Sequence, residues 1–202
     1  NLARRVAVQA GVDEMPGTTV NRFCASSVQT TRMAMHAIRA GEGDVFISAG
    51  VDCVSRYRDP ILGGSDPERL VNPLFADAMA RTKAISEANA KWSDPREEGL
   101  LPDVFISMGE TAENVATLYG ISRDEQDEWA VRSQNRAEEA INSGFFEREI
   151  VPVTLPDGST VAKDDGPRAG TTYEAVSQLK PVFRPNGTIT AGNAGPLNDG
   201  AP

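Results

Sequence analysis

The sequence predicts an α/β fold, and the first fifty residues carry the main evidence. A strand-like run at residues 18–23 is followed by a helical pattern over residues 25–40, and an apolar run at residues 44–49 predicts a second strand. Strand, helix and strand in this order predict a right-handed βαβ unit with parallel strands. The second strand barely alternates between apolar and polar residues, so we expect it to be buried on both faces.

Helical signals dominate the rest of the chain. An apolar face at the start ends at Gly11, and two capping boxes of the form Ser-x-x-Glu begin at Ser107 and Ser122. In the helix after Ser122, Trp129 falls on the expected packed face and the charged residues on a solvated face. The expected helices cover residues 2–10, 25–40, 74–91, 107–119 and 122–142.

A β-hairpin is expected near residue 157. Residues 149–155 and 159–162 are rich in β-branched residues, and Pro-Asp-Gly at 156–158 separates them. A turn-forming triplet between two such runs is a hairpin signal.

Composition restricts the class of protein and its partners. The chain has 202 residues, of which 40% are hydrophobic, and its formal charge is 20 − 29 = −9. This charge argues against a nucleic-acid partner, because phosphate backbones attract basic surfaces. No apolar run reaches the ~20 residues that a bilayer helix needs, and no secretory leader opens the chain. Two cysteines without a framework spacing indicate a reducing compartment, so we expect a cytoplasmic protein without a membrane partner.

Cys24 is the most informative residue, because it lies where the first strand meets the first long helix. Unpaired backbone N–H groups and the helix dipole favour a thiolate at a helix N-terminus, which makes a sulfur there a candidate nucleophile. A small, buried core residue is the alternative interpretation, since free cysteines are commonly buried.

Four motifs in order resemble those of the thiolases. They are Asn-Arg-Phe-Cys-Ala-Ser-Ser-Val-Gln at 21–29, Gly-Glu-Gly-Asp-Val-Phe-Ile-Ser-Ala-Gly at 41–50, Ser-Met-Gly-Glu-Thr-Ala-Glu-Asn at 107–114, and Thr-Ala-Gly-Asn-Ala-Gly-Pro-Leu-Asn-Asp-Gly at 190–200. The resemblance implies part of a layered αβαβα core with an inserted α+β loop domain. Its implied divisions are 1–54 for the core, 55–189 for the loop domain and 190–202 for the return to the core.

The resemblance also implies a reaction and a site. The reaction is acyl transfer between coenzyme A thioesters with Cys24 as the acylated residue, and the protein would be a homodimer or homotetramer. Coenzyme A is then a substrate, so we expect no cofactor and no metal. The implied acyl-CoA and coenzyme A contacts are Arg168 at the phosphates or adenosine, and Met108, Phe183, Ala191 and Gly195 along the pantetheine and acyl route.

The only histidine, His36, is too distant to serve as the base for Cys24. Twelve residues at 1.5 Å each place it ~18 Å away along one helix. In thiolases the activating histidine and a second cysteine come from a C-terminal domain. The resemblance therefore implies a fragment that lacks the start of the N-terminal domain and the whole C-terminal domain, and that is inactive alone.

Two departures from the family motifs favour a degradative enzyme. Ser107 stands where biosynthetic thiolases often carry histidine, and Gly195-Pro196 replaces a Ser-Gly pair. These departures favour longer acyl groups, as in fatty-acid or sterol side-chain breakdown. Two alternatives stay open: a ketoacyl-synthase-like or lipid-carrying relative, and a non-catalytic protein that binds coenzyme A or a subunit.

Overall fold

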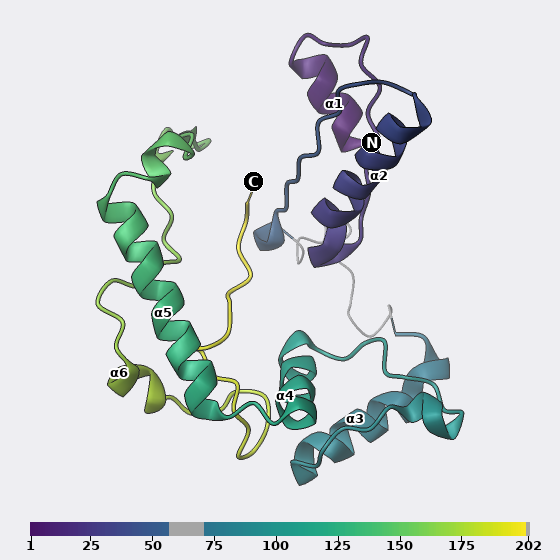
Figure 1. Ribbon diagram of the computed structural model, residues 1–202, viewed down its shortest axis with the longest axis vertical. Coiled ribbons are helices and arrows are strands. Elements are labelled where there is room, and N and C mark those ends of the chain that lie inside the picture. Colours follow the sequence, from purple (N-terminus) through teal and green to yellow (C-terminus); the bar gives the residue numbers. More distant parts are fainter. Residues whose placement is uncertain (57–70, 201–202) are drawn as a thin grey trace. The chain divides into compact units, whose positions relative to one another are not determined.

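The computed structural model describes residues 1–56 and 71–200, which are mostly helical (Figure 1). The chain divides into two compact units, one formed by Asn1–Gly64 with Leu197–Pro202 and the other by Ser65–Pro196. The last residues of the chain therefore belong to the same unit as the first. The division into a catalytic core and a loop domain stays a prediction, and residues 57–70 of that loop domain lie outside the described residues.

Both helices expected in the first unit are confirmed. Helix α1 spans Leu2–Gln9, and the Asn1 side chain caps it by accepting a hydrogen bond from the Arg4 amide. A short 3₁₀ turn, η1 at Phe23–Ala25, leads into α2 at Ser26–Ala40. Gly41 ends α2 in the left-handed region with φ +76°, where glycine has no Cβ penalty.

The two strands expected at residues 18–23 and 44–49 are wrong, and with them the βαβ unit. Neither segment joins a strand ladder in the part of the chain that the structure describes. Val45 and Ile47 are 81% and 80% exposed, so the second segment is not buried on both faces. A strand requires a neighbour for its backbone groups. Instead, the Ser48 hydroxyl approaches those of Thr30 and Thr31 on α2, at 2.7 and 3.2 Å.

The returning end of the chain pairs with the first unit at a single point. Asp52 and Gly200 form an isolated antiparallel bridge, with N···O distances of 2.8 and 3.0 Å. The adjoining turn is η2, Val54–Arg56. Residues far apart in the sequence are thereby joined within this unit.

The second unit contains the remaining helices. Ser107 and Ser122 cap α4 and α5 as expected, and the capping box at Ser122 is confirmed by reciprocal hydrogen bonds with Glu125. At Ser107 only the N-cap forms, because the Glu110 carboxylate accepts from Ser86 and Arg184 instead. The helix predicted over 74–91 is shorter, because Asn89 ends it in the left-handed conformation. The elements are η5 Pro73–Phe75, α3 Ala76–Ala88, η6 Pro95–Glu98, α4 Met108–Tyr119, α5 Arg123–Asn142, η7 Phe146–Arg148 and α6 Tyr173–Ser177.

The hairpin is confirmed but is shorter than expected. Strands β1 (Val153–Thr154) and β2 (Thr160–Val161) pair antiparallel, with Val153 opposite Val161. Gly158 in the connecting turn has φ +85°, a conformation that suits glycine.

The core of the second unit is notably polar. Its most deeply buried large residues are Glu113, Asp127 and Thr190, and the Arg184 side chain is buried as well, whereas Trp129 is 67% exposed. The prediction that Trp129 is packed and the charged residues of α5 are solvated is therefore wrong at positions 127 and 129. The helix packs against α6 and residues 188–193 through the face that carries Asp127. No described helix is long and apolar enough to cross a membrane.

Candidate active site

Cys24 lies in η1, immediately before α2, with its side chain exposed. The predicted place at the start of a helix is confirmed, and the alternative of a buried core residue is not what this structure shows. The thiol next to the N-terminus of α2 is exposed, so a substrate can reach it.

Hydrogen bonds between side chains and backbone shape the turn that holds Cys24. The Ser26 hydroxyl accepts from the Arg22 amide at 2.8 Å and donates to the Phe23 carbonyl at 2.7 Å. Asn21 accepts from the Phe23 amide at 2.9 Å. Phe23 has φ +47°, a left-handed conformation that is costly for a bulky residue and that these hydrogen bonds offset.

His36 is exposed on α2, well beyond the first turn of the helix. Its position agrees with the separation of ~18 Å expected from the helical rise. It does not supply a base to Cys24. Among residues 1–56 and 71–200, no group of three or more His, Cys, Asp or Glu side chains is placed to hold a metal ion.

The second cysteine belongs to a cluster around Asp199 in the same unit. The Asp199 carboxylate accepts from the Ser55 amide at 2.8 Å and the Ser55 hydroxyl at 2.7 Å, and the Cys53 sulfur lies 3.7 Å from it. These donors, the Ser55 amide above all, lower the pKa of Asp199. Asp199 therefore holds the chain around residue 199 next to Cys53.

In the second unit, Glu113 holds residues 188–189 against α4. This side chain is 1% exposed, and both of its carboxylate oxygens accept from the Thr188 amide, at 2.9 and 3.0 Å. The Ile189 amide donates to it at 2.9 Å. A Cβ at position 187 would overlap the carboxylate, so Gly187 permits this close approach. A buried carboxylate is satisfied here by backbone donors.

Asp127 holds the same segment from α5. Its side chain is fully buried and accepts from Arg123 Nε at 2.6 Å and from Asn193 Nδ2 at 2.9 Å. Asn193 in turn accepts from the Thr190 amide at 2.7 Å and donates to the Thr188 carbonyl at 2.9 Å. Helices α4 and α5 together thus fix residues 188–193, which Figure 1 shows as the yellow-green loop beside them.

Arg168 and Ala191 are brought together. Arg168 Nη1 donates to the Ala191 carbonyl at 3.4 Å, and the Arg168 amide donates to Gln134 on α5 at 2.8 Å. The exposed guanidinium forms no ion pair with a carboxylate in the described residues. Its charge is therefore available to an anionic ligand.

Phe183 packs on the first turn of α4, the helix that begins at Met108. A Cβ on Gly109 would overlap the Phe183 ring, so the ring packs on the helix backbone next to Met108, which is 73% exposed. Gly195 has open space around its Cα. All five expected contact residues thus lie in the second unit, and Cys24 lies in the first.

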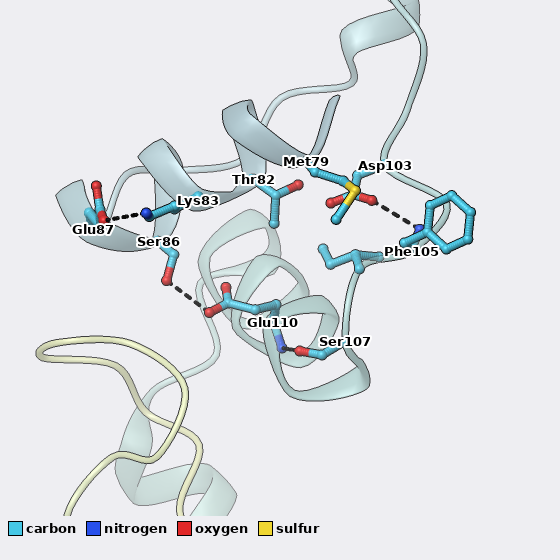
Figure 2. A pocket seen from close by; sticks show the side chains of 10 residues that line it. Met79, Thr82, Lys83, Ser86, Glu87, Asp103, Phe105, Ser107 and Glu110 are labelled. Atoms are coloured by element: carbon cyan, nitrogen blue, oxygen red, sulfur yellow. Dashed lines mark hydrogen bonds and ion pairs between the residues drawn. The ribbon is translucent and has the colours of Figure 1, made fainter. Parts of the chain in front are cut away.

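A cavity of about 400 Å³ lies between α3 and the segment that leads into α4 (Figure 2). Met79 and Phe105 contribute apolar walls, and Glu110 points across to the Ser86 hydroxyl, 2.8 Å away. Glu110 also accepts from Arg184, whose side chain is fully buried. The polar groups of the cavity are therefore largely committed to one another.

Sequence analysis missed the polar residues that shape the site. Asp127 and Arg184 resemble ordinary charged helix or loop residues in the sequence, and Glu113 was visible only as a member of the 107–114 motif. The long-range partners of these three residues lie 66 to 76 residues away. Asn193 was visible as part of the 190–200 motif, but nothing local indicated its contact with Asp127.

Comparison with known proteins identifies the family. The chain matches the family described as thiolase, N-terminal domain, over residues 1–202. A beta-ketoadipyl-CoA thiolase of Acinetobacter baylyi is 40% identical and an acetyl-CoA acetyltransferase of Cupriavidus necator 39% identical, each over 100% of this chain and 49% of the relative. The chain therefore spans about half the length of the curated relatives it matches.

Solved structures agree. The dimeric peroxisomal thiolase of Saccharomyces cerevisiae superposes with a TM-score of 0.73 at 31% identity, over 98% of this chain and 45% of that one. Human mitochondrial 3-ketoacyl-CoA thiolase in complex with CoA superposes with a TM-score of 0.66 at 31% identity, over 99% of this chain and 47% of that one. The family match over the whole chain, together with these structures, shows that this chain belongs to the thiolase family and represents its N-terminal domain.

Proposed function

We propose that the complete protein containing this chain is an acyl-CoA C-acyltransferase of the thiolase type, with Cys24 as the acyl carrier. The observation that carries the proposal is the exposed Cys24 thiol at the start of α2, in a chain that matches the thiolase N-terminal domain throughout. In this proposal residues 1–54 and 190–202 belong to the αβαβα core and residues 55–189 form the loop domain over coenzyme A.

The reaction has two balanced steps. The Cys24 thiolate attacks the 3-keto carbon of a 3-ketoacyl-CoA, the bond between C2 and C3 breaks, and the released acetyl-CoA carbanion takes a proton. The thiolate of free coenzyme A then attacks the Cys24 thioester, so that acyl-CoA leaves and the Cys24 thiolate is regenerated. Both steps require proton transfer by a base, and His36 is too remote to act as one. The base is therefore expected outside this chain.

Arg168 is proposed to bind the phosphates or adenosine of coenzyme A. Its exposed guanidinium is held near Ala191 and has no carboxylate partner among the described residues, and a guanidinium suits phosphate oxygens. Met108, Phe183, Ala191 and Gly195 are proposed along the pantetheine and acyl route. In the complete enzyme, Arg168→Ala should raise KM for coenzyme A with little change in kcat, and an unchanged KM would remove Arg168 from the site.

The acyl carrier can be tested by mass. The complete enzyme is incubated with acetyl-CoA, and its intact mass and peptide map are measured beside those of Cys24→Ser and Cys53→Ser. We expect an acetyl adduct that maps to Cys24, persists in Cys53→Ser and is absent from Cys24→Ser. An adduct on Cys53 with none on Cys24 would contradict the proposal.

A thiolysis assay separates the catalytic proposal from a non-catalytic one. Three samples are compared: this 202-residue chain, the chain mixed with the remainder of the protein, and the complete protein. We expect turnover in the complete protein, lost in Cys24→Ser, and none in the chain alone. Turnover by the chain alone would place the base within it. Binding of coenzyme A without turnover in any sample would favour a non-catalytic binding protein.

The substrate is proposed to be a longer acyl-CoA, in fatty-acid or sterol side-chain breakdown in the cytoplasm, with the enzyme as a homodimer or homotetramer. Ser107 and Gly195 support this through their departures from the biosynthetic motifs. The relatives are described as thiolases for beta-ketoadipyl-CoA and as acetyl-CoA acetyltransferases, so the acyl group is best tested with a panel of chain lengths. A higher kcat/KM for acetoacetyl-CoA than for long chains would refute the substrate proposal.

A further inference from the structure

Helix α5 supports both parts of the proposed coenzyme A site. Gln134 accepts from the Arg168 amide at 2.8 Å, and Asp127, two turns earlier, accepts from Asn193 at 2.9 Å. The two anchored segments contact each other, since Arg168 Nη1 donates to the Ala191 carbonyl at 3.4 Å. One helix therefore sets the relative position of the arginine and of the carbonyl that it contacts.

Asp127 determines the orientation of the Asn193 amide. A carboxylate only accepts hydrogen bonds, so it draws the Asn193 NH₂ group toward itself. The Asn193 oxygen then faces the Thr190 amide, 2.7 Å away, and the same NH₂ group reaches the Thr188 carbonyl at 2.9 Å. Both ends of the loop around Ala191 depend on that orientation.

The buried charge of Asp127 is matched on its other side. Arg123 Nε donates to it at 2.6 Å, and Arg123 Nη2 donates to the carbonyls of Val176 and Leu179, at 3.1 and 3.0 Å. A Cβ on Gly192 would lie 2.7 Å from Leu179 Cδ1 and 2.9 Å from Val176 Cγ1. The loop is therefore packed tightly against the residues that Arg123 holds, and it has little room to take another path.

We propose that Asp127 is a positioning residue for coenzyme A binding: through Asn193 it fixes the loop whose Ala191 carbonyl holds Arg168. The inference rests on the proposed function, because it assigns Arg168 and Ala191 to the coenzyme A site. Asp127 is fully buried, so it would act through Asn193 and not by contacting a ligand itself. Its loss should weaken coenzyme A binding while leaving the chemistry at Cys24 in place.

The test is Asp127→Asn in the complete protein, with coenzyme A affinity measured by titration calorimetry and kcat and KM by thiolysis. The new amide has one accepting oxygen in place of two, so it cannot accept from both Arg123 and the Asn193 NH₂ group, and the anchoring of the loop is weakened. We expect roughly tenfold weaker binding and a matching rise in KM for coenzyme A, with kcat within about twofold, as for the loss of one contact of ordinary strength. The matched control is Asp124→Asn on the same helix, whose carboxylate accepts from the Tyr173 hydroxyl; it should bind as the wild type does.

The pair Asp127 and Asn193 also permits a rescue experiment. Asn193→Asp alone sets two carboxylates against each other and should bind worst. Asp127→Asn with Asn193→Asp restores one donor and one acceptor, so it should bind more tightly than Asn193→Asp. A residue that serves stability alone would lower the melting temperature without this recovery of affinity.

Three outcomes would overturn the proposal: affinity for coenzyme A in Asp127→Asn within twofold of the wild type, equal losses in Asp124→Asn, or no rescue in the double variant. If Asp127→Asn does not fold, Asn193→Ser keeps the pair of Asp127 and Arg123 and must show the same weaker binding. Calorimetry also separates this inference from the proposed function. A wild type that binds coenzyme A without turnover would refute the function and leave the positioning role testable.

Discussion

Replacing Glu113 should release residues 188–189 from α4. Its buried carboxylate accepts from the Thr188 and Ile189 amides, and Glu113→Ala leaves both donors without that partner. Each unsatisfied buried donor costs about 1–3 kcal/mol, so we expect the local opening free energy of the segment to fall by about 3 kcal/mol. Glu113→Gln keeps an acceptor for the Ile189 amide and should cost about 1 kcal/mol.

Amide hydrogen exchange of residues 184–190 measures this effect where it arises. Because 1.4 kcal/mol corresponds to a factor of ten, exchange should accelerate ~100-fold in Glu113→Ala and about fivefold in Glu113→Gln. Glu139→Ala, at an exposed position of α5, is the control and should leave exchange in this segment unchanged. Exchange in Glu113→Ala within twofold of the wild type would refute the assignment of Glu113 as the anchor.

One further substitution and one pH titration test contacts in the separate units. Gly109→Ala places a methyl group on the Phe183 ring, so it should speed amide hydrogen exchange across residues 183–189. This is expected even though alanine is more favourable than glycine in a helix by about 1 kcal/mol. Slower exchange would show that the ring moves aside freely. In the first unit, the hydrogen bonds from Ser55 lower the pKa of Asp199. The contact therefore contributes its full stabilisation at pH values above the ordinary aspartate pKa of ~3.9, and this stabilisation is lost as pH falls through the lowered pKa. The NMR signal of the Ser55 amide should therefore hold steady down to about pH 3.9 and move below it, and a midpoint above that value would contradict the assigned sign.

Helix boundaries followed from the sequence because their signals are local. Ser107 and Ser122 cap helices through hydrogen bonds that span three residues, and Gly41 and Gly120 end helices in a conformation that suits glycine. The position of Cys24 before α2 came from the same kind of evidence. Such features need no knowledge of the rest of the fold.

The strand predictions were wrong because strand formation depends on distant partners. The apolar run at residues 44–49 has the composition of a buried strand, yet Val45 and Ile47 are exposed and form no ladder in the described part of the chain. Composition reports a tendency to be buried, whereas pairing depends on which other segments lie alongside. The likeness to solved thiolases supports the family fold, and the described strands are two short ones.

The burial of Asp127 and Glu113 could not be predicted for a related reason. Helical periodicity assigns Asp127 to a solvated face, since an isolated carboxylate is costly to bury. Its actual environment is supplied by Arg123 on the same helix and Asn193, 66 residues later. The same holds for Glu113 and the amides near residue 188. A pattern within one helix cannot anticipate donors that arrive from a loop.

These contacts assign separate roles to neighbouring residues of the 190–193 motif. Thr190 is fully buried and Asn193 is tied to Asp127, so the polar members hold the loop in place. Ala191 is exposed and offers its carbonyl to Arg168, and Gly192 fits against Val176 where a larger residue would clash. Substitution of a polar member should therefore alter affinity through the position of the loop. In the proposed site, a direct contact with coenzyme A falls instead to the small residues, whose backbone the polar ones hold.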